Sequence, residues 1–355
     1  MRILSATSGS AALLWCLAVV PTLGAQTERR TLSGDRVAIY NLAGRLSVEG
    51  GSGSDVVVEI TPGGRDADRL RVEQGPIRGR ETLRIVYPSD RVVYSALGRG
   101  SRATIRVNDD GTWGDRESGD SGDRRNRTEI TGSGSGLEAY ADIRVLVPRG
   151  QQVAVYHAVG DAHITSVDAD LAVNVASADV SAERTRGHLR LDTGSGTLRV
   201  TDVQGDIDLD TGSGGVTVRG VKGESLRMDT GSGSIRGGDI DVAELKADVG
   251  SGGVGLDRVR AARVDVDAGS GSTELEILSN IEQLKVEAGS GSVTVHLPSS
   301  TSADVDIETG SGGIDTDFAV QVTRFERRHI VGRIGDGRGR IRIESGSGSV
   351  RLLKG

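Results

Sequence analysis

Short stretches of alternating apolar and polar residues recur along most of this chain, and Gly-Ser-Gly corners separate them. In one copy, alternating residues 207–209 precede the corner at Gly212, and alternating residues 216–218 follow it. Alternation with a period of two is typical of a β-strand that buries one face. No stretch beyond the first 25 residues has helical periodicity. The pattern therefore predicts an all-β protein with two short strands in each repeat.

The corners recur at nearly constant intervals. Their first glycines are Gly194, Gly212, Gly231, Gly250, Gly269, Gly289, Gly310 and Gly346. The intervals are 18, 19, 19, 19, 20, 21 and 36 residues, and the last equals two units of 18 with one unreadable copy between. A period of this length marks a solenoid, in which each coil buries its apolar face against its neighbours. We predict a single-chain β-solenoid (β-helix) of roughly 18–20-residue coils, forming a rod on the order of 50 Å long.

The pattern also divides the chain into sections. Residues 26–107 hold less regular strands and predict an N-terminal β section of atypical first coils or a cap. Residues 108–136 are rich in Asp, Gly, Arg, Ser and Asn, which predicts a flexible polar insertion. Residues 137–355 carry the regular solenoid, with an irregular coil near 318–338. The chain ends on a strand at 350–352, which is expected to leave an open edge unless something pairs with it, so end-to-end assembly is a second hypothesis.

Residues 1–25 have the features of a signal peptide. Arg2 supplies the positive start, residues 11–20 form a short apolar core, and Leu23-Gly24-Ala25 precedes a plausible cleavage point. The apolar run is shorter than the ~20 residues that a membrane-spanning helix needs. Cys16, the only cysteine, lies inside this segment, so the exported chain is expected to hold neither a disulfide nor a thiolate metal site. The expected location is the periplasm, the cell surface or the medium.

The repeated corners, with the strand that ends at Pro148-Arg149-Gly150, resemble the bacterial "putative adhesin" β-solenoid family. Members of that family are secreted or envelope proteins of largely unknown function. The resemblance covers residues 148–316, returns at 339–352 and extends loosely to 37–58. It implies an exported, adhesin-like interaction scaffold of the cell envelope.

Charge is unevenly distributed along the chain. The formal net charge is −7, yet residues 319–355 hold nine Arg or Lys against three acids, a local charge of +6. Such a section favours contact with anionic envelope polymer, lipid headgroups or the acidic body of another copy. We expect no nucleic-acid partner and no transmembrane segment in the mature chain. The candidate interaction patch comprises Arg324, Arg327, Arg328, Arg333, Arg338, Arg340 and Arg342.

A row of acids supports a competing, enzymatic interpretation. One carboxylate lies two residues before each corner glycine: Asp192, Asp210, Asp229, Asp248, Asp267, Glu287, Glu308 and Glu344. Stacked about 5 Å apart, these acids could bind cations or serve as the acid and base of a polysaccharide-active enzyme. The plainer interpretation is that they bond the turn backbone or are solvated. Because a catalytic pair needs one special site and every coil looks alike, we predict a non-enzymatic scaffold with the enzyme as the alternative.

Other catalytic and metal chemistries are not indicated. Residues that follow the corners, such as Thr197 and Leu198, lack the aspartate of a calcium-binding β-roll. No histidine recurs beside the corner serines, which argues against repeated nucleophiles. The histidines lie at unrelated positions of the repeat, namely His157, His163, His188, His296 and His329. We therefore predict no catalytic residue, no cofactor and no metal site.

Overall fold

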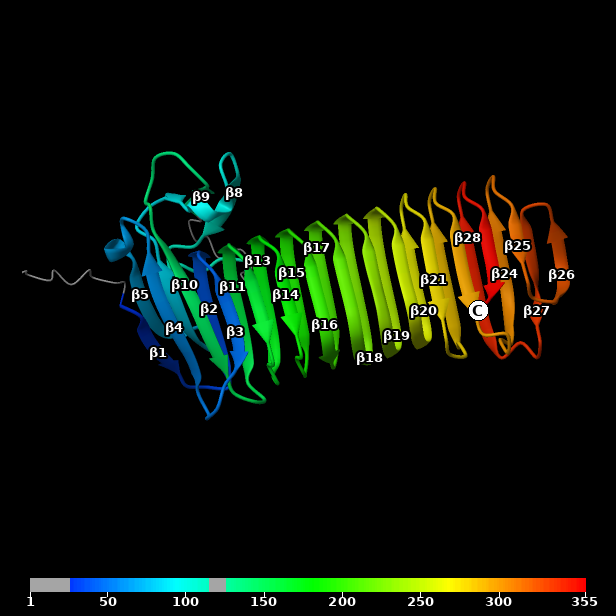
Figure 1. Cartoon of the computed structure of the whole chain (residues 1–355), viewed down its shortest axis with the longest axis horizontal. Helices are drawn as coiled ribbons and strands as arrows, with labels where there is room; N and C mark the ends of the chain where they lie inside the picture. The colour runs from blue at the N-terminus through cyan, green and yellow to red at the C-terminus, as the bar shows by residue number, and fades with distance from the viewer. Residues whose placement is uncertain (1–25, 115–125) are drawn as a thin grey trace, which may run out of the picture.

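The structure, a computed structural model, describes residues 26–114 and 126–355. The predicted signal peptide and part of the predicted insertion, residues 115–125, lie outside the described residues. The described chain forms a long rod built almost entirely of strands (Figure 1). This arrangement confirms the predicted all-β solenoid. Within the two described ranges, no helix has the length and apolar character needed to cross a bilayer.

Strands stack along the rod in two columns, and each regular coil contributes one strand to each column (Figure 1). We call the end that holds the N-terminal strands proximal and the opposite end distal. From proximal to distal, column A contains β5 (Arg71–Ile77), β6 (Arg80–Val86), β2 (Arg36–Ala43), β11 (Gln152–Val159), β13 (Asp170–Ser177), β15 (Leu189–Ser195), β17 (Ile207–Ser213), the second halves of β18 (Val216–Ser232), β19 (Ile235–Ser251) and β20 (Val254–Ala268), then β22 (Gln283–Ala288), β28 (Gly339–Ser345), β24 (Ala303–Thr309), β27 (His329–Ile334) and β26 (Val320–Glu326).

Column B follows the same direction. It contains β1 (Glu28–Leu32), β4 (Val56–Gly63), β10 (Tyr140–Val147), β3 (Leu46–Gly50), β12 (Ala162–Thr165), β14 (Val180–Glu183), β16 (Leu198–Gln204), the first halves of β18, β19 and β20, then β21 (Thr273–Ile277), β23 (Val293–Leu297), β29 (Val350–Lys354) and β25 (Ile314–Thr316). Neighbouring coils pair in parallel and in register, so that Leu189 lies beside Ile207 and Leu191 beside Leu209. Like residues therefore stack on like residues.

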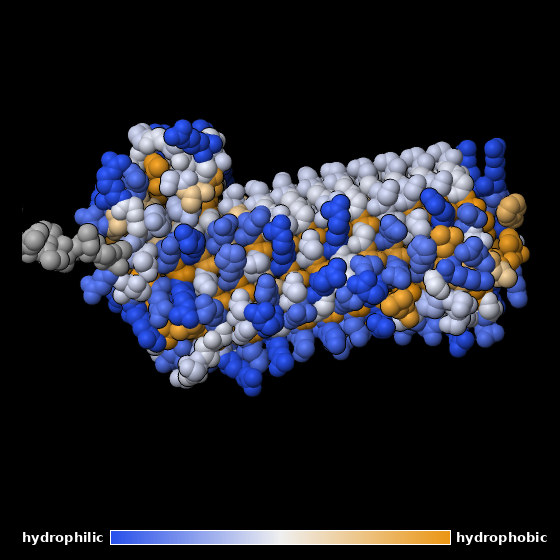
Figure 2. All heavy atoms as spheres, viewed as in Figure 1, coloured by the Kyte–Doolittle hydropathy of each residue, from blue (hydrophilic) through white to orange (hydrophobic). Residues whose placement is uncertain are grey.

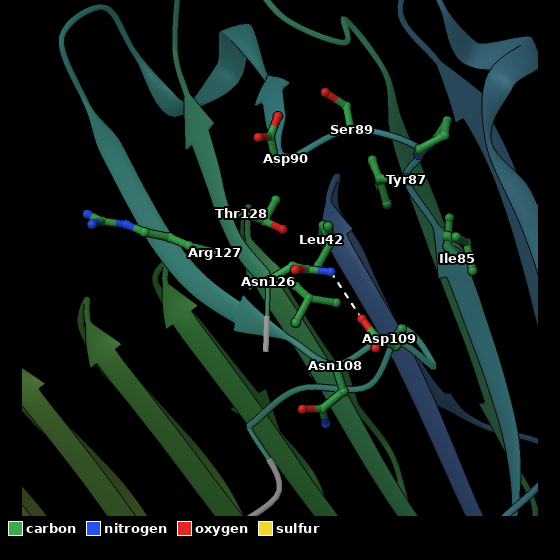
Figure 3. Close-up of a pocket in the computed structure, with 14 residues that line it drawn as sticks. Leu42, Ile85, Tyr87, Ser89, Asp90, Asn108, Asp109, Asn126, Arg127 and Thr128 are labelled. Atoms are coloured by element: carbon green, nitrogen blue, oxygen red, sulfur yellow. Dashed lines mark hydrogen bonds between the residues drawn. The ribbon is translucent and has the colours of Figure 1, made fainter. Parts of the chain in front are cut away.

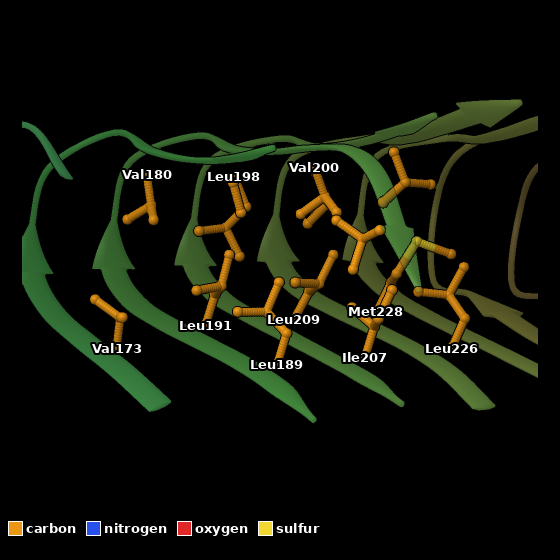
Figure 4. Close-up of a cluster of buried hydrophobic side chains, with 14 of the residues drawn as sticks. Val173, Val180, Leu189, Leu191, Leu198, Val200, Ile207, Leu209, Leu226 and Met228 are labelled. Carbon is orange, nitrogen blue, oxygen red and sulfur yellow. The ribbon is translucent and has the colours of Figure 1, made fainter. Parts of the chain in front are cut away.

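The apolar core lies between the two columns. Leu189 and Leu191 of β15 point toward Leu198 and Val200 of β16, and all four side chains are buried (Figure 4). Each fully buried aliphatic side chain contributes about 1.5–3 kcal/mol. Since one coil exposes the ends of its own core, this burial stabilises the coils only when they are stacked.

Glycines at the corners allow the coils to approach each other closely. Gly214 has a φ of +147°, and a Cβ atom there would lie 2.1 Å from the backbone oxygen of Gly196 in the preceding coil. Buried threonines add bonds between coils beside these corners. Thr230 donates its hydroxyl to the backbone oxygen of Gly214 at 2.8 Å, and Thr211 donates to that of Gly196 at 3.1 Å.

The distal coils are not stacked in sequence order. The last coil, formed by β28 and β29, lies between the coil of β22 and β23 and the coil of β24 and β25. The chain therefore reaches the distal end first, forms the β26–β27 hairpin there, and returns to complete the rod. This order corrects two predictions. The 36-residue interval holds a hairpin in place of an unreadable coil, and the final strand is paired on both sides.

The proximal end has a similar exchange. The coil of β2 and β3 pairs with β11 and β12 on its distal side. On its proximal side it pairs with β6 and with β10, which lies much later in the sequence. Antiparallel pairing of β1 with β4, β4 with β10, and β5 with β6 ends the rod there. Residues 26–107 thus supply both a coil and capping strands, together with two short 3₁₀ helices, η1 (Ala67–Arg69) and η2 (Ser95–Leu97).

A small second sheet stands beside the proximal end (Figure 1). Its strands are β7 (Arg91–Val93), β9 (Asn126–Thr131) and β8 (Arg102–Val107), in that order. The prediction of a flexible insertion over 108–136 is therefore wrong for β9, because this segment forms a paired strand in which Thr128 and Ile130 are buried. Trp113 is only 6% exposed and packs edge-on against Tyr156, so the segment before the gap is also ordered.

Candidate functional site

The predicted carboxylates form a continuous ladder on the outer face of column A. The strand registers place them in the order Asp192, Asp210, Asp229, Asp248, Asp267, Glu287, Glu344 and Glu308. The distal reversal exchanges the last two members relative to the sequence. Partial burial raises the pKa of Asp229, and the carboxylates of Asp248 and Asp210 on either side raise it further. Burial and the carboxylates of Asp248 and Glu287 act on the pKa of Asp267 in the same way.

A neighbouring row of mixed charge reduces the repulsion along this ladder. Lys285 Nζ lies 2.9 Å from a carboxylate oxygen of Glu287 and 3.9 Å from one of Asp265. Arg342 donates to Glu344 at 2.6 Å. The ladder thus distributes similar acids over many coils and does not set one pair apart. Among the described residues, no group of three or more His, Cys, Asp or Glu has the arrangement of a metal site.

Neutralising one ladder acid tests this description. Asp229→Asn is expected to raise the thermal midpoint at pH 7, because a raised pKa means that the charged carboxylate is less favourable in the folded chain than in the unfolded chain. The gain should shrink as the pH falls and the wild-type carboxyl becomes protonated. Asp241→Asn serves as the control. Asp241 lies between Lys222 and Arg260, so this substitution removes favourable charge interactions and should not raise the thermal midpoint. An equal effect of both substitutions would contradict the ladder electrostatics.

The seven predicted arginines lie near the distal end but do not form one uniform patch. Arg324 lies on β26, and Arg327 and Arg328 form the turn to β27. Arg333 donates to Asp304 at 2.8 Å, and Arg342 is paired with Glu344 as described above. Arg338 precedes β28, and Arg340 lies on it. Within residues 26–114 and 126–355, no carboxylate pairs with the side chains of Arg324, Arg327, Arg338 and Arg340.

A groove of about 740 Å³ runs over the outer face of the distal strands. Arg333, Arg340 and Arg342 line it together with Asp304 and Asp306. His329 contacts Asp306 at 2.8 Å, so both acids of the groove are already engaged by basic side chains. The arginines without an acidic partner among the described residues therefore lie on β26, in the β26–β27 turn and at the start of β28.

Apolar side chains are exposed at the same end, which sequence reasoning missed. Phe325 is 74% exposed and Val322 is 48% exposed, and both belong to β26, the last strand of column A. The remaining exposed large apolar side chain in the described ranges is Leu278, at 39%, on the side of the rod. Figure 2 shows apolar surface at the distal end of the rod. The loss of Gly-Ser-Gly corners near Phe318 and Phe325 was the available sequence signal.

A buried polar network lies in the proximal core, where the sequence analysis had placed no site. The hydroxyl of Tyr87 donates to the side-chain oxygen of Asn41 at 2.8 Å. The Asn41 amide lies 3.4 Å from Nδ1 of His157, whose Nε2 lies 2.9 Å from the backbone oxygen of Gly44. Because His157 is fully buried, desolvation lowers its pKa to about 4. These bonds hold the neutral imidazole of His157 inside the core and stabilise the folded protein.

A polar pocket of about 510 Å³ separates the small sheet from the rod (Figure 3). Leu42 and Tyr87 lie on its rod side, and Asn108, Asp109 and Asn126 on the other. Asn126 donates to Asp109 at 3.1 Å.

Comparison with known proteins agrees with this architecture. No protein with a curated description matches the sequence. One solved structure, described as a "putative cell adhesion protein" from Clostridium sporogenes, aligns over 93% of this chain and 99% of its own, with 10% identity and a TM-score of 0.19. The family model Toastrack DUF4097 matches residues 123–353, which span most of the rod. The chain therefore belongs to the Toastrack DUF4097 family.

Proposed function

We propose that this protein is an exported, non-enzymatic scaffold of the cell envelope whose distal end makes the binding contact. One observation carries the proposal: cations without acidic partners and exposed apolar side chains occur together at that end. The sides of the rod have a different character, because acids and bases alternate there and many are paired. A regular shaft with one distinctive end suits a protein that presents a contact surface at a distance from its base.

The carboxylate ladder supports a scaffold better than an enzyme. A polysaccharide-active enzyme needs two carboxyl groups in different environments, so that one is protonated while the other is charged. In the ladder, Asp229 and Asp267 have the same cause of pKa elevation and the same kind of neighbours. The similarity of successive coils gives substrate no preferred position along the rod.

The partner expected from the charge is anionic: envelope polymer, lipid headgroups or the acidic body of another copy. Export rests on the signal-peptide features of residues 1–25. Arg327 and Arg328 are the residues to change first, because both are exposed at the distal turn and neither is paired with a carboxylate among the described residues.

The test is a pull-down from envelope extract with purified protein at low and high salt. The double variant Arg327→Glu/Arg328→Glu should retain less envelope material, and its remaining binding should depend less on salt. Arg236→Glu/Arg260→Glu makes the same charge change on the side of the rod and should bind as the wild type does. Equal retention by all three proteins would reject the distal end as the contact surface.

A further inference from the structure

The β26–β27 hairpin combines two kinds of exposed side chain at the distal limit of the rod. A bulge between Val322 and Arg324 changes the alternation of β26, so Val322 lies beside Gly332 and Phe325 beside Ile330. Because Gly332 and Ile330 are on the same face of β27, the bulge brings both exposed apolar side chains to one face. Two of the three exposed large apolar residues in the described ranges thus lie close together on one edge strand.

Three cations lie next to these apolar groups along the chain: Arg324 on the opposite face of β26, and Arg327 and Arg328 in the turn that follows it. Arg324 and Arg327 have no carboxylate partner among the described residues, and Arg328 donates to the backbone oxygen of Gly310 at 2.6 Å. Glu326 is the one acid within residues 320–328. The hairpin is therefore both basic and apolar. Since β26 is the last strand of column A, a flat surface can meet it without obstruction by the next coil.

Each class of partner would use these features differently. Addition of another strand to β26 is disfavoured by the bulge and by Arg324, which are common guards of open sheet edges. A second copy meeting end to end would bring two sets of arginines together. A soluble polyanion would engage the arginines but leave Phe325 in water. An anionic lipid surface receives both, because apolar side chains enter the interface while guanidinium groups bind phosphate.

We propose that residues 320–334 bind an anionic phospholipid surface, with Phe325 and Val322 in the interfacial region and Arg324, Arg327 and Arg328 at the phosphates. This inference rests on the proposed function, since it names the chemistry that the distal end contacts. The backbone edge of β26 would stay at headgroup depth, where water and phosphate satisfy its unpaired groups. The rod would then project away from the membrane.

Co-sedimentation with vesicles tests the proposal. One set of vesicles contains phosphatidylcholine alone, and the other contains phosphatidylcholine with phosphatidylglycerol. Wild-type protein should bind the anionic vesicles and not the neutral ones. Arg324→Glu/Arg327→Glu should weaken binding by at least about 30-fold, from ~1 kcal/mol for each cation. Phe325→Ser should weaken it by roughly tenfold or more. Leu278→Ser removes the third exposed apolar side chain and should have no effect. Loss of binding only in the arginine variant, or an equal loss in Leu278→Ser, would overturn the proposal.

Fluorescence of Phe325→Trp gives an independent readout of insertion. Its emission should shift to shorter wavelength with anionic vesicles, while Leu278→Trp, which adds a tryptophan on the side of the rod, should not respond. Binding to soluble polyphosphate without a shift at position 325, or a concentration-dependent dimer abolished by Phe325→Ser, would assign the surface to another partner. Retention of envelope material by wild type but no vesicle binding would reject the lipid partner while leaving the scaffold function in place.

Discussion

Gly214→Ala is expected to lower the free energy of unfolding by about 3–5 kcal/mol, since it adds steric overlap to backbone strain. The new Cβ atom would lie 2.1 Å from the backbone oxygen of Gly196, well inside the contact distance of the two atoms. At a φ of +147°, an alanine is also strained in the absence of any neighbour. Relief requires the two coils to separate at the corner, which would weaken the bond from Thr230 to the same turn.

Gly255→Ala is the matched control for this prediction. Gly255 lies inside β20, and a Cβ atom there would meet nothing within 4 Å. We expect this variant to unfold at the wild-type urea concentration or slightly above it, because alanine restricts the unfolded chain more than glycine does. The measurement is the urea midpoint followed by circular dichroism. Equal midpoints for the two variants would show that close approach at the corners does not limit the coil spacing.

Stability is expected to fall by about 3 kcal/mol as the pH is lowered from about 6.5 to about 4, through His157 alone. The folded protein holds this imidazole neutral with a pKa of about 4, whereas in the unfolded chain its pKa returns to about 6.5. Above pH 6.5 neither state binds the proton. Between the two values the unfolded chain binds it and the folded chain does not, so protonation favours unfolding.

His157→Gln separates the contribution of His157 to the pH dependence of stability from that of the carboxyl groups, which titrate in an overlapping pH range. The glutamine amide can donate to the backbone oxygen of Gly44 in place of Nε2 and has no proton to gain. The variant should be less stable at pH 7 and should lose less stability between pH 6.5 and pH 4 than the wild type does. Urea unfolding at a series of pH values measures the difference. Parallel curves for the two proteins would contradict a neutral buried imidazole.

The repeat made the fold predictable because a solenoid repeats one local rule. Alternation placed Leu189 and Leu191 in the core, and the spacing of the corners placed Asp192 beside Asp210. Both of these placements depend only on the local pattern and on residues one repeat apart. The order of the distal coils could not be predicted in this way. Glu344 matches Glu287 and Glu308 equally well as a neighbour, so the sequence pattern does not determine which coil lies between the others.

Features that depend on contacts between distant segments were also missed. The segment at 126–131 is short and polar, and it becomes a strand only because β7 and β8 lie on either side of it. Asn41 and His157 are far apart in the sequence and meet because β2 and β11 pair. The basic section near the C-terminus could be seen from charge alone. Its association with the exposed Phe325 and Val322 required the hairpin geometry.

In our proposal the rod is a shaft and the distal hairpin makes the contact. Hydrogen–deuterium exchange with and without phosphatidylglycerol-containing vesicles tests it directly, because backbone protection is read along the whole chain. Protection confined to residues 320–334, with unchanged exchange along the ladder strands and the small proximal sheet, is the predicted result. Protection along β15, β17 and β18, or within β7, β8 and β9, with none in the hairpin would contradict the account.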